Sequence, residues 1–220
     1  MVKHFQRELD KVKKMLLSLG ALAETRVRQI KQVVEDRDDV VAREVIHLDY
    51  EIDEMEVDIE EECLKIIALH QPVASDLRFL IAVIKINNDL ERIGDQVVNI
   101  AQRVISMAKK PGVPYQYDYA EMTDKAEAML RMSLDSLVNQ DIDQAIKVLH
   151  LDDDVDALKD KAYDRIKGAL ATGQAADVGY MINLLLISRH IERLADHATN
   201  IAEEVIYMIE GEIVRHGRLD

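Results

Sequence analysis

The residues best suited to chemistry lie in one stretch that the chain contains twice. The first copy begins at Asp89 and the second at His190, and the two copies are offset by 101 residues throughout. Both keep the pattern E-R-x-x-D-x-x-x-N-I-A. Because a sequence repeat usually corresponds to a repeated structural unit, we expect each copy to hold the same place in a duplicated fold.

The spacing within the stretch predicts a helix with one acidic face. Side chains four residues apart lie about 40° apart on a helix that turns by about 100° per residue. The apolar residues of each copy gather on the opposite side of the same helix. Each copy therefore presents three oxygen-bearing side chains away from its own core: Glu91, Asp95 and Asn99 in the first, and Glu192, Asp196 and Asn200 in the second.

A second acidic pair precedes each copy. Its members are four residues apart and share a helical face: Asp49 and Asp53 in the first half, and Asp152 and Asp156 in the second. Each half thus offers four carboxylates and one amide oxygen on neighbouring helices. Such donors suit hard or intermediate cations, so we expect divalent or trivalent metal ions, among them Mg²⁺, Mn²⁺ and iron, bound singly or as multinuclear clusters.

The acidic face of the helix that precedes each copy differs between the halves in the residues that follow the acidic pair. Glu56 and Glu60 continue it in the first half, whereas Lys159 and Tyr163 stand at the corresponding places in the second. Equal metal occupancy of the two halves therefore does not follow from the repeat. Acidic pairs are common on solvated helix faces. We nevertheless expect a functional role for this acidic face, because both copies of the repeat keep their polar face as well as their apolar one.

Six amphipathic helices are needed to position these residues. Apolar side chains recur at three and four residues over six segments: 5–34, 39–70, 73–109, 119–139, 141–171 and 175–211. The strongest linker signal, Pro111–Tyr115, falls at the midpoint. The prediction is an all-α fold of two tandem three-helix bundles, with the boundaries 1–110 for the first bundle, 111–118 for the linker and 119–220 for the second bundle.

Composition excludes several classes of protein. A formal net charge of −14 argues against direct binding of nucleic acid and against docking on anionic lipid, and it favours cations or a basic partner. The single cysteine, Cys63, allows no internal disulfide, and the first residues show no signal peptide. The apolar runs are too short to span a bilayer. We therefore expect a cytoplasmic protein without a transmembrane segment.

Other possible chemistry is weaker. His190 and His197 lie at the edge of an apolar stripe, where packing at a boundary is a better interpretation than metal ligation. Glu44–His47 matches the Glu-x-x-His of di-iron bundles, but its equivalent Lys147–His150 lacks the glutamate. The sequence has no phosphate-binding glycine loop, no paired cysteines and no nucleophile with a recognisable base. We therefore predict no catalytic residue.

The doubled stretch resembles the PhoU family of phosphate-uptake regulators. The likeness rests on residues 89–101 and 191–202 and on Gln71–Phe79, and it extends over nearly the whole chain. It implies two three-helix bundles with pseudo-twofold symmetry and a cytoplasmic protein, often a homodimer, that reaches the inner membrane only through partners. It also implies a negative regulator that links the ATPase subunit of the phosphate ABC transporter to the phosphate-sensing histidine kinase.

The resemblance also implies metal clusters on the family's (Glu/Asp)-x-x-x-Asp motifs. These motifs match eight residues of this chain: Asp49, Asp53, Glu91, Asp95, Asp152, Asp156, Glu192 and Asp196. Two alternatives stay open. One is a metal-dependent phosphatase or oxidase that uses the same carboxylates, although catalytic metals usually sit in enclosed pockets beside a positioned base. The other is a structural adaptor whose acidic faces bind basic partner surfaces without metal.

Overall fold

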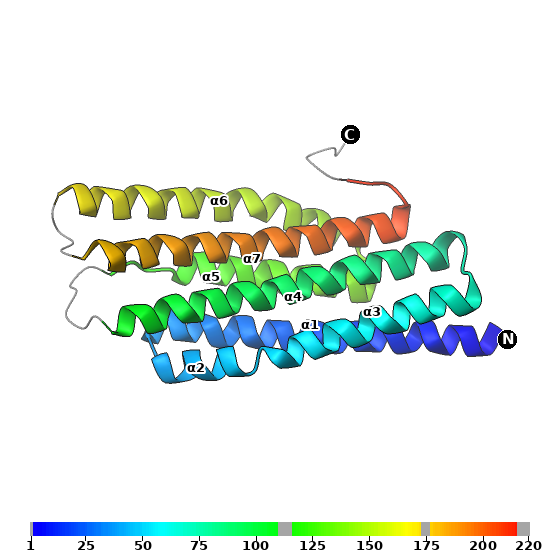
Figure 1. Cartoon of the computed structure of the whole chain (residues 1–220). Helices are drawn as coiled ribbons and strands as arrows, with labels where there is room; N and C mark the ends of the chain where they lie inside the picture. Colours follow the sequence, from blue (N-terminus) through cyan, green and yellow to red (C-terminus); the bar gives the residue numbers. More distant parts are fainter. Residues whose placement is uncertain (1, 110–115, 173–176, 215–220) are drawn as a thin grey trace.

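The regular structure of the described chain is α-helical. The computed structural model describes residues 2–109, 116–172 and 177–214, so most of the expected linker lies outside the described residues. Seven helices follow one another (Figure 1): α1 (Val2–Asp36), α2 (Asp39–His47), α3 (Tyr50–His70), α4 (Ala74–Ala108), α5 (Ala120–Asn139), α6 (Ile142–Ala171) and α7 (Val178–Glu210). The all-α prediction is confirmed, and five of the six expected helices are found as single helices within a few residues of the expected limits.

The helix expected over residues 39–70 is divided, and that part of the prediction is wrong. The Leu48 amide still donates to the Glu44 carbonyl at 3.0 Å, but the Glu51 amide bonds to the Leu48 carbonyl at 3.2 Å, a tighter turn. Leu48, with φ −91° and ψ 4°, leaves the α-helical region. The apolar period continues across this break, which is why the sequence does not reveal it. The break places Asp49 at the start of α3.

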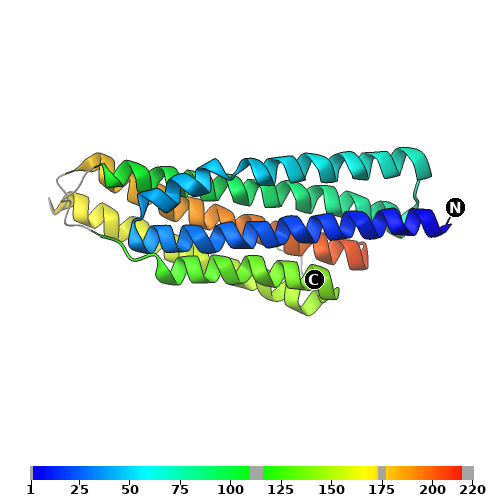
Figure 2. The ribbon, with the colours of Figure 1, turned by 90° about the horizontal axis from the view of Figure 1, so that it is seen from below.

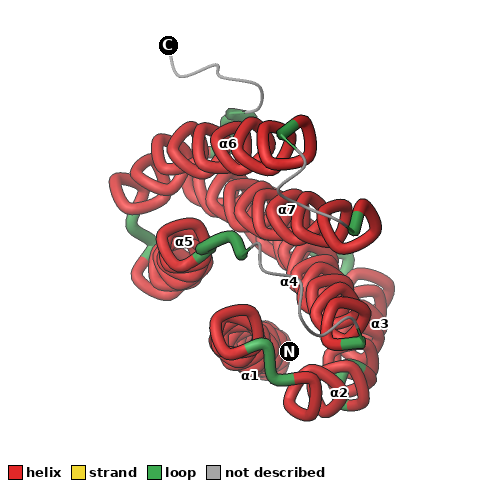
Figure 3. Tube along the Cα trace, turned by 90° about the vertical axis from the view of Figure 1, so that its left-hand side faces the viewer, coloured by secondary structure: helices red, strands yellow, loops and turns green. Residues whose placement is uncertain are grey.

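Helices α4 and α7 form the centre of the molecule. They run side by side in opposite directions, with α2 and α3 against α4 and α5 and α6 against α7 (Figures 1 and 3). Asp89 Oδ1 lies 2.9 Å from His197 Nδ1, and Gln96 Oε1 lies 3.0 Å from His190 Nδ1. Because the repeat equates position 89 with 190 and position 96 with 197, these two contacts are one contact made twice. The halves are thus related by an approximate twofold axis between α4 and α7.

The apolar faces predicted for the doubled stretch form the core. They are almost completely inaccessible to solvent in both copies, as Leu90, Ile93, Val97 and Ile100 in α4 and Ile191, Leu194, Ala198 and Ile201 in α7 show. Each large aliphatic side chain buried in this way contributes about 1.5–3 kcal/mol. One continuous core joins both halves, so the carboxylates on the opposite faces are displayed from a rigid support.

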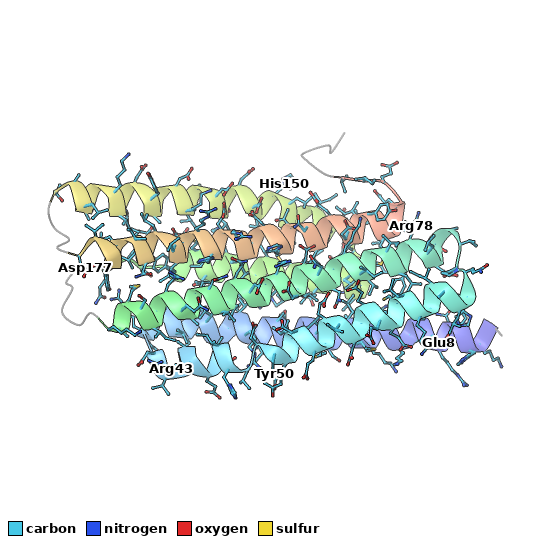
Figure 4. All side chains as sticks on the ribbon, viewed as in Figure 1. Glu8, Arg43, Tyr50, Arg78, His150 and Asp177 are labelled. Atoms are coloured by element: carbon cyan, nitrogen blue, oxygen red, sulfur yellow. The ribbon has the colours of Figure 1, made fainter. Side chains whose placement is uncertain are left out.

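A second contact between the halves joins α1 and α5, which lie beside each other in Figure 2. A Cβ atom at Gly20 would lie 2.9 Å from Leu134 Cδ2. The glycine therefore allows the two helices to approach closely. At the far end of the molecule, Arg78 Nε donates to the Met208 carbonyl at 3.1 Å, where the start of α4 meets the end of α7 (Figure 4).

Candidate metal-binding faces

The first-half carboxylates converge from α3 and α4. Asp49 precedes Tyr50 at the start of α3 (Figure 4), and Asp53 follows one turn later, while Glu91 and Asp95 lie on α4. Burial, followed by the negative charges of Asp53 and Asp95, raises the pKa of Asp49 to about 6. Three of the predicted residues therefore interact across two helices. We call Asp49, Asp53, Glu91 and Asp95 the first acidic cluster.

A glycine on α4 allows this convergence. A Cβ atom at Gly94 would lie 3.3 Å from Asp49 Oδ1 and 3.1 Å from Ile52 Cδ1. A side chain at this position would have to displace the side chains of Ile52 and Asp49. The repeat places Ala195 at this position in the second half.

Glu91 has one oxygen atom that suits a cation. Burial raises the pKa of its carboxyl, as does the neighbouring charge of Asp95. Its Oε2 atom is buried and accepts no hydrogen bond from the described residues; Arg92 Nε, 3.3 Å away, does not have hydrogen-bond geometry. Asn87, one turn earlier and fully buried, likewise leaves Oδ1 without a hydrogen bond from the described residues. Buried oxygens without donors are costly, and a bound cation would relieve that cost.

Asn87 was not predicted as a site residue. Its spacing of four residues from Glu91 is the signal that could have drawn attention to it. Its Nδ2 donates to the Glu56 carbonyl at 2.8 Å, which ties α4 to α3. The predicted Asn99 is half-buried, two turns beyond Glu91 on α4.

Two arginines lie near the first acidic cluster. Arg92 Nη1 donates to Asp95 Oδ2 at 3.1 Å, but this side chain is 50% exposed and its partners are on its own helix. Arg26 of α1 is buried and donates to Glu51, and its charge partly offsets the rise in the pKa of Asp49. Neither arginine bonds to carboxylates of the cluster on both α3 and α4.

The second-half carboxylates converge in the same way from α6 and α7. Burial raises the pKa of Asp196 to about 6, with further contributions from Glu192, Asp152 and Asp156. The pKa of Asp152 is also raised by burial, against the hydrogen bond that it accepts from Thr199 Oγ1 at 3.3 Å. We call Asp152, Asp156, Glu192 and Asp196 the second acidic cluster.

Lys159 is bound within the second acidic cluster. Its Nζ lies 2.9 Å from Asp156 Oδ1 on α6 and 3.0 Å from Glu192 Oε1 on α7. The hydrogen bond to Asp156 is the main reason why the pKa of this lysine is raised. The equivalent residue of the first half is Glu56, whose pKa is raised by burial and by the charges of Glu60 and Asp53. One half thus holds a fixed cation where the other holds another carboxylate.

The predicted Asn200 contacts the other half of the molecule. Its Nδ2 donates to Asp89 Oδ1 at 3.1 Å, the same oxygen that His197 contacts. His190 is half-buried near Arg103 and Arg193, and the loss of solvent around it is the main cause that lowers its pKa to about 4. Each of these histidines on α7 thus contacts a residue of α4 across the boundary between the halves. Asp89 was not predicted in this role, because its partner is known only once α4 and α7 are in register.

The carboxylates of each cluster do not converge on one point as the ligands of a bound metal ion would. Within the described ranges, no three His, Cys, Asp or Glu side chains are arranged closely enough to hold a metal ion as they stand. Four like charges repel one another until a cation is present. Beside the first cluster, a pocket of about 660 Å³ opens between α3, α4 and α7, lined mainly by polar residues that include Glu56, Glu60, Asp89 and Asn200.

Comparison with known proteins places the chain among phosphate-transport accessory proteins. The PhoU domain family model matches twice, at residues 16–104 and 119–205. The chain is 36% identical to the phosphate-specific transport system accessory protein PhoU homolog of Pseudomonas aeruginosa, covering 96% of this chain and 88% of that one. It is 37% identical to the homolog of Aquifex aeolicus, covering 96% and 95%.

Solved structures agree with the sequence comparison. The crystal structure of PhoU from Pseudomonas aeruginosa matches with a TM-score of 0.89 and 34% identity, covering 94% of this chain and all of that one. The phosphate transport system regulatory protein PhoU from Streptococcus pneumoniae matches with a TM-score of 0.89 and 27% identity, covering 96% of this chain and all of that one. The similarity therefore includes both halves and their arrangement.

Proposed function

The chain belongs to the PhoU family, and from this premise we propose that it negatively regulates phosphate uptake as a non-catalytic adaptor. Relatives that match over nearly the full chain are named accessory proteins of the phosphate-specific transport system, which supports a role in phosphate-transport regulation. In this proposal the adaptor connects the ATPase subunit of the phosphate ABC transporter to the sensor histidine kinase. It acts as a homodimer in the cytoplasm and meets the inner membrane through these partners.

The adaptor would act by differential affinity. Binding shifts a partner between two states only when it favours one of them energetically. A rigid bundle with strongly acidic faces is suited to such a role, because its charged surface can select a partner conformation that presents basic groups. Among the described residues, no helix has the length and apolarity that crossing a membrane requires.

The first acidic cluster provides donors that fit a metal ion. Asp49, Asp53, Glu91 and Asp95 would hold it. The observation that supports this assignment is the buried Glu91 Oε2, which accepts no hydrogen bond from the described residues and whose ion pair, with Arg92 at 3.3 Å, stays within its own helix. A bound divalent or trivalent cation would supply the positive charge that offsets the repulsion among these carboxylates. In the proposal, its effect is to fix α3 against α4 and so to stiffen the surface that the partners meet.

The observation that favours an adaptor over a metalloenzyme is exposure. The Asp95 side chain is 42% exposed, the Asp156 side chain is 52% exposed, and Asp53 is also exposed. Catalytic metals generally require a dry pocket with a positioned base. A phosphatase assay with Mn²⁺ or Fe²⁺ tests the alternative, and turnover that Asp95→Asn abolishes would establish it in place of the adaptor.

Co-purification tests the partners. The tagged chain should retain the transporter ATPase subunit and the cytoplasmic part of the sensor kinase, and removing its gene should raise phosphate uptake and derepress a phosphate-regulon reporter. Capture of neither partner, with unchanged reporter output, would refute the adaptor assignment.

Elemental analysis tests the metal. Replacing Asp95 and Asp196 together by asparagine should remove the bound metal while the protein remains folded by circular dichroism. Metal content equal to that of the wild type would refute the assignment of both clusters without affecting the partner proposal.

A further inference from the structure

The two acidic clusters differ in how their equivalent glutamates are paired. Glu91 and Glu192 hold the same place in the repeat. Glu91 Oε2 accepts no hydrogen bond from the described residues and forms an ion pair at 3.3 Å with Arg92 of its own helix, whereas Glu192 Oε1 accepts a hydrogen bond at 3.0 Å from Lys159 Nζ of the neighbouring helix. The side chains are similarly exposed, at 22% and 18%. The difference therefore comes from the partner and not from solvent.

Lys159 occupies the position of a bridging cation. Its ammonium group joins Asp156 on α6 to Glu192 on α7, with Asp160 Oδ1 a further 3.9 Å contact. An ammonium group is a compact point charge with three donors, and here it bridges carboxylates on two helices as a metal ion would. Because this ammonium group belongs to a side chain of the protein, it is present at any metal concentration.

We propose that Lys159 is the resident cation of the second acidic cluster and confines metal binding in this chain to the first cluster. This inference rests on the proposed metal binding of the first cluster. A metal ion at the second cluster would have to displace the lysine from two carboxylates and then tolerate a positive charge nearby. At about 4 Å, two unit charges near a protein surface repel by enough to weaken binding at least about tenfold.

The test isolates the second cluster. In a background that carries Asp49→Asn and Asp95→Asn, Lys159→Gln removes the cation and Lys159→Glu restores the charge found at Glu56 in the first half. The matched control is Lys125→Gln, because Lys125 is also 29% exposed and bonds to an aspartate of α6, Asp154, at 2.8 Å but outside the cluster. Mn²⁺ binding to chelator-treated protein is measured by equilibrium dialysis and by loss of the free Mn²⁺ spectrum in electron paramagnetic resonance.

With Lys159 intact, the background should bind little Mn²⁺, and Lys125→Gln should leave it unchanged. Both Lys159 variants should raise Mn²⁺ affinity at least about tenfold, and adding Asp196→Asn should abolish the gain. If Lys159→Gln binds no more Mn²⁺ than Lys125→Gln, the inference is overturned. It is also overturned if the background keeps half of the wild-type metal.

The two proposals fail in different ways. If wild-type protein binds no Mn²⁺ but the Lys159 variants do, the first cluster is not a metal site and the role of Lys159 stands. If the glutamate variant does not fold, the glutamine variant alone decides, since it removes a charge without adding one.

Discussion

The first and second acidic clusters are built from the same repeat, yet they balance their charge differently. In the first, Asp49 and Glu91 are held near other carboxylates, and Glu56 adds one more negative charge. In the second, Lys159 bonds to carboxylates on two helices. The apolar faces beneath the clusters are buried alike. The apolar faces that carry the two clusters are thus alike, whereas Lys159 gives the second cluster a positive charge where the first has Glu56.

The difference shows that a repeated motif does not establish a repeated function. The pattern of four carboxylates is complete in both halves, and a residue outside the pattern, at position 159, gives the second half a cation where the first half has Glu56. Because electrostatic interactions depend on every nearby charge, the ligand set alone does not determine whether a cation binds. The following changes test how far the comparison holds, beginning with the shared support.

Truncating an equivalent buried side chain in either half should lower stability by a similar amount, and this is the largest effect that we expect. Leu90→Ala and Ile191→Ala change equivalent, fully buried residues of α4 and α7. Each should lower the free energy of unfolding by about 2–5 kcal/mol, through lost burial and the cavity that remains. Urea denaturation followed by circular dichroism measures both values. A large loss in only one half would break the equivalence of the two supports.

In the first half, α4 carries a glycine, Gly94, where it meets the start of α3. Gly94→Leu should cost about 1–3 kcal/mol, because the new side chain meets Ile52 and Asp49. The matched change Ala195→Gly should cost about 1 kcal/mol from helix propensity. Thermal unfolding compares the two variants. If Gly94→Leu is as stable as the wild type, the contact of Asp49 with α4 is not as described here.

The bridging lysine should contribute more to stability than the arginine of the first half. In metal-free protein, Lys159→Met should lower the free energy of unfolding by up to about 1 kcal/mol, since it leaves Asp156 and Glu192 unpaired. Arg92→Met should cost less, because Arg92 is half exposed and its partners are on its own helix. The reverse order in chemical denaturation would argue that Arg92, not Lys159, is the structurally important cation.

The dependence of stability on pH should be small and shared by both halves. In the folded state, burial raises the pKa of Asp49 and of Asp196 to about 6, above the ordinary value of 3.8. Between these values the folded state binds more protons than the unfolded state, so these groups favour folding increasingly as the pH falls from 7 to 5. Asp49→Asn and Asp196→Asn should each reduce that gain. If either variant gains as much melting temperature between pH 7 and pH 5 as the wild type, the described burial of its carboxyl group is contradicted.

Much of the architecture could be predicted from the sequence. Apolar spacing predicted the helices, and the doubled stretch predicted which residues of α4 and α7 are buried. The break at Leu48 could not be predicted, because the apolar period continues through it. A local change in backbone hydrogen bonding leaves no trace in the spacing of side chains.

The side-chain contacts between different helices could not be predicted from the sequence for a different reason. Position 159 was recognised as a departure from the acidic pattern, but its bond to Glu192 depends on how α6 and α7 align. The same holds for Arg26 beside Asp49 and for the pairing of Asp89 with His197. Each needs the register of two helices that are far apart in the chain, and a single sequence does not contain that register.

Crystals of the wild-type protein grown with Mn²⁺ and measured at the manganese absorption edge test the central claim most directly. Anomalous density beside Glu91 and Asp95, with none beside Glu192 and Asp196, is the predicted result. Density of equal strength at both clusters, or density beside Glu192 alone, would contradict the claim that Lys159 already serves as the cation of the second half.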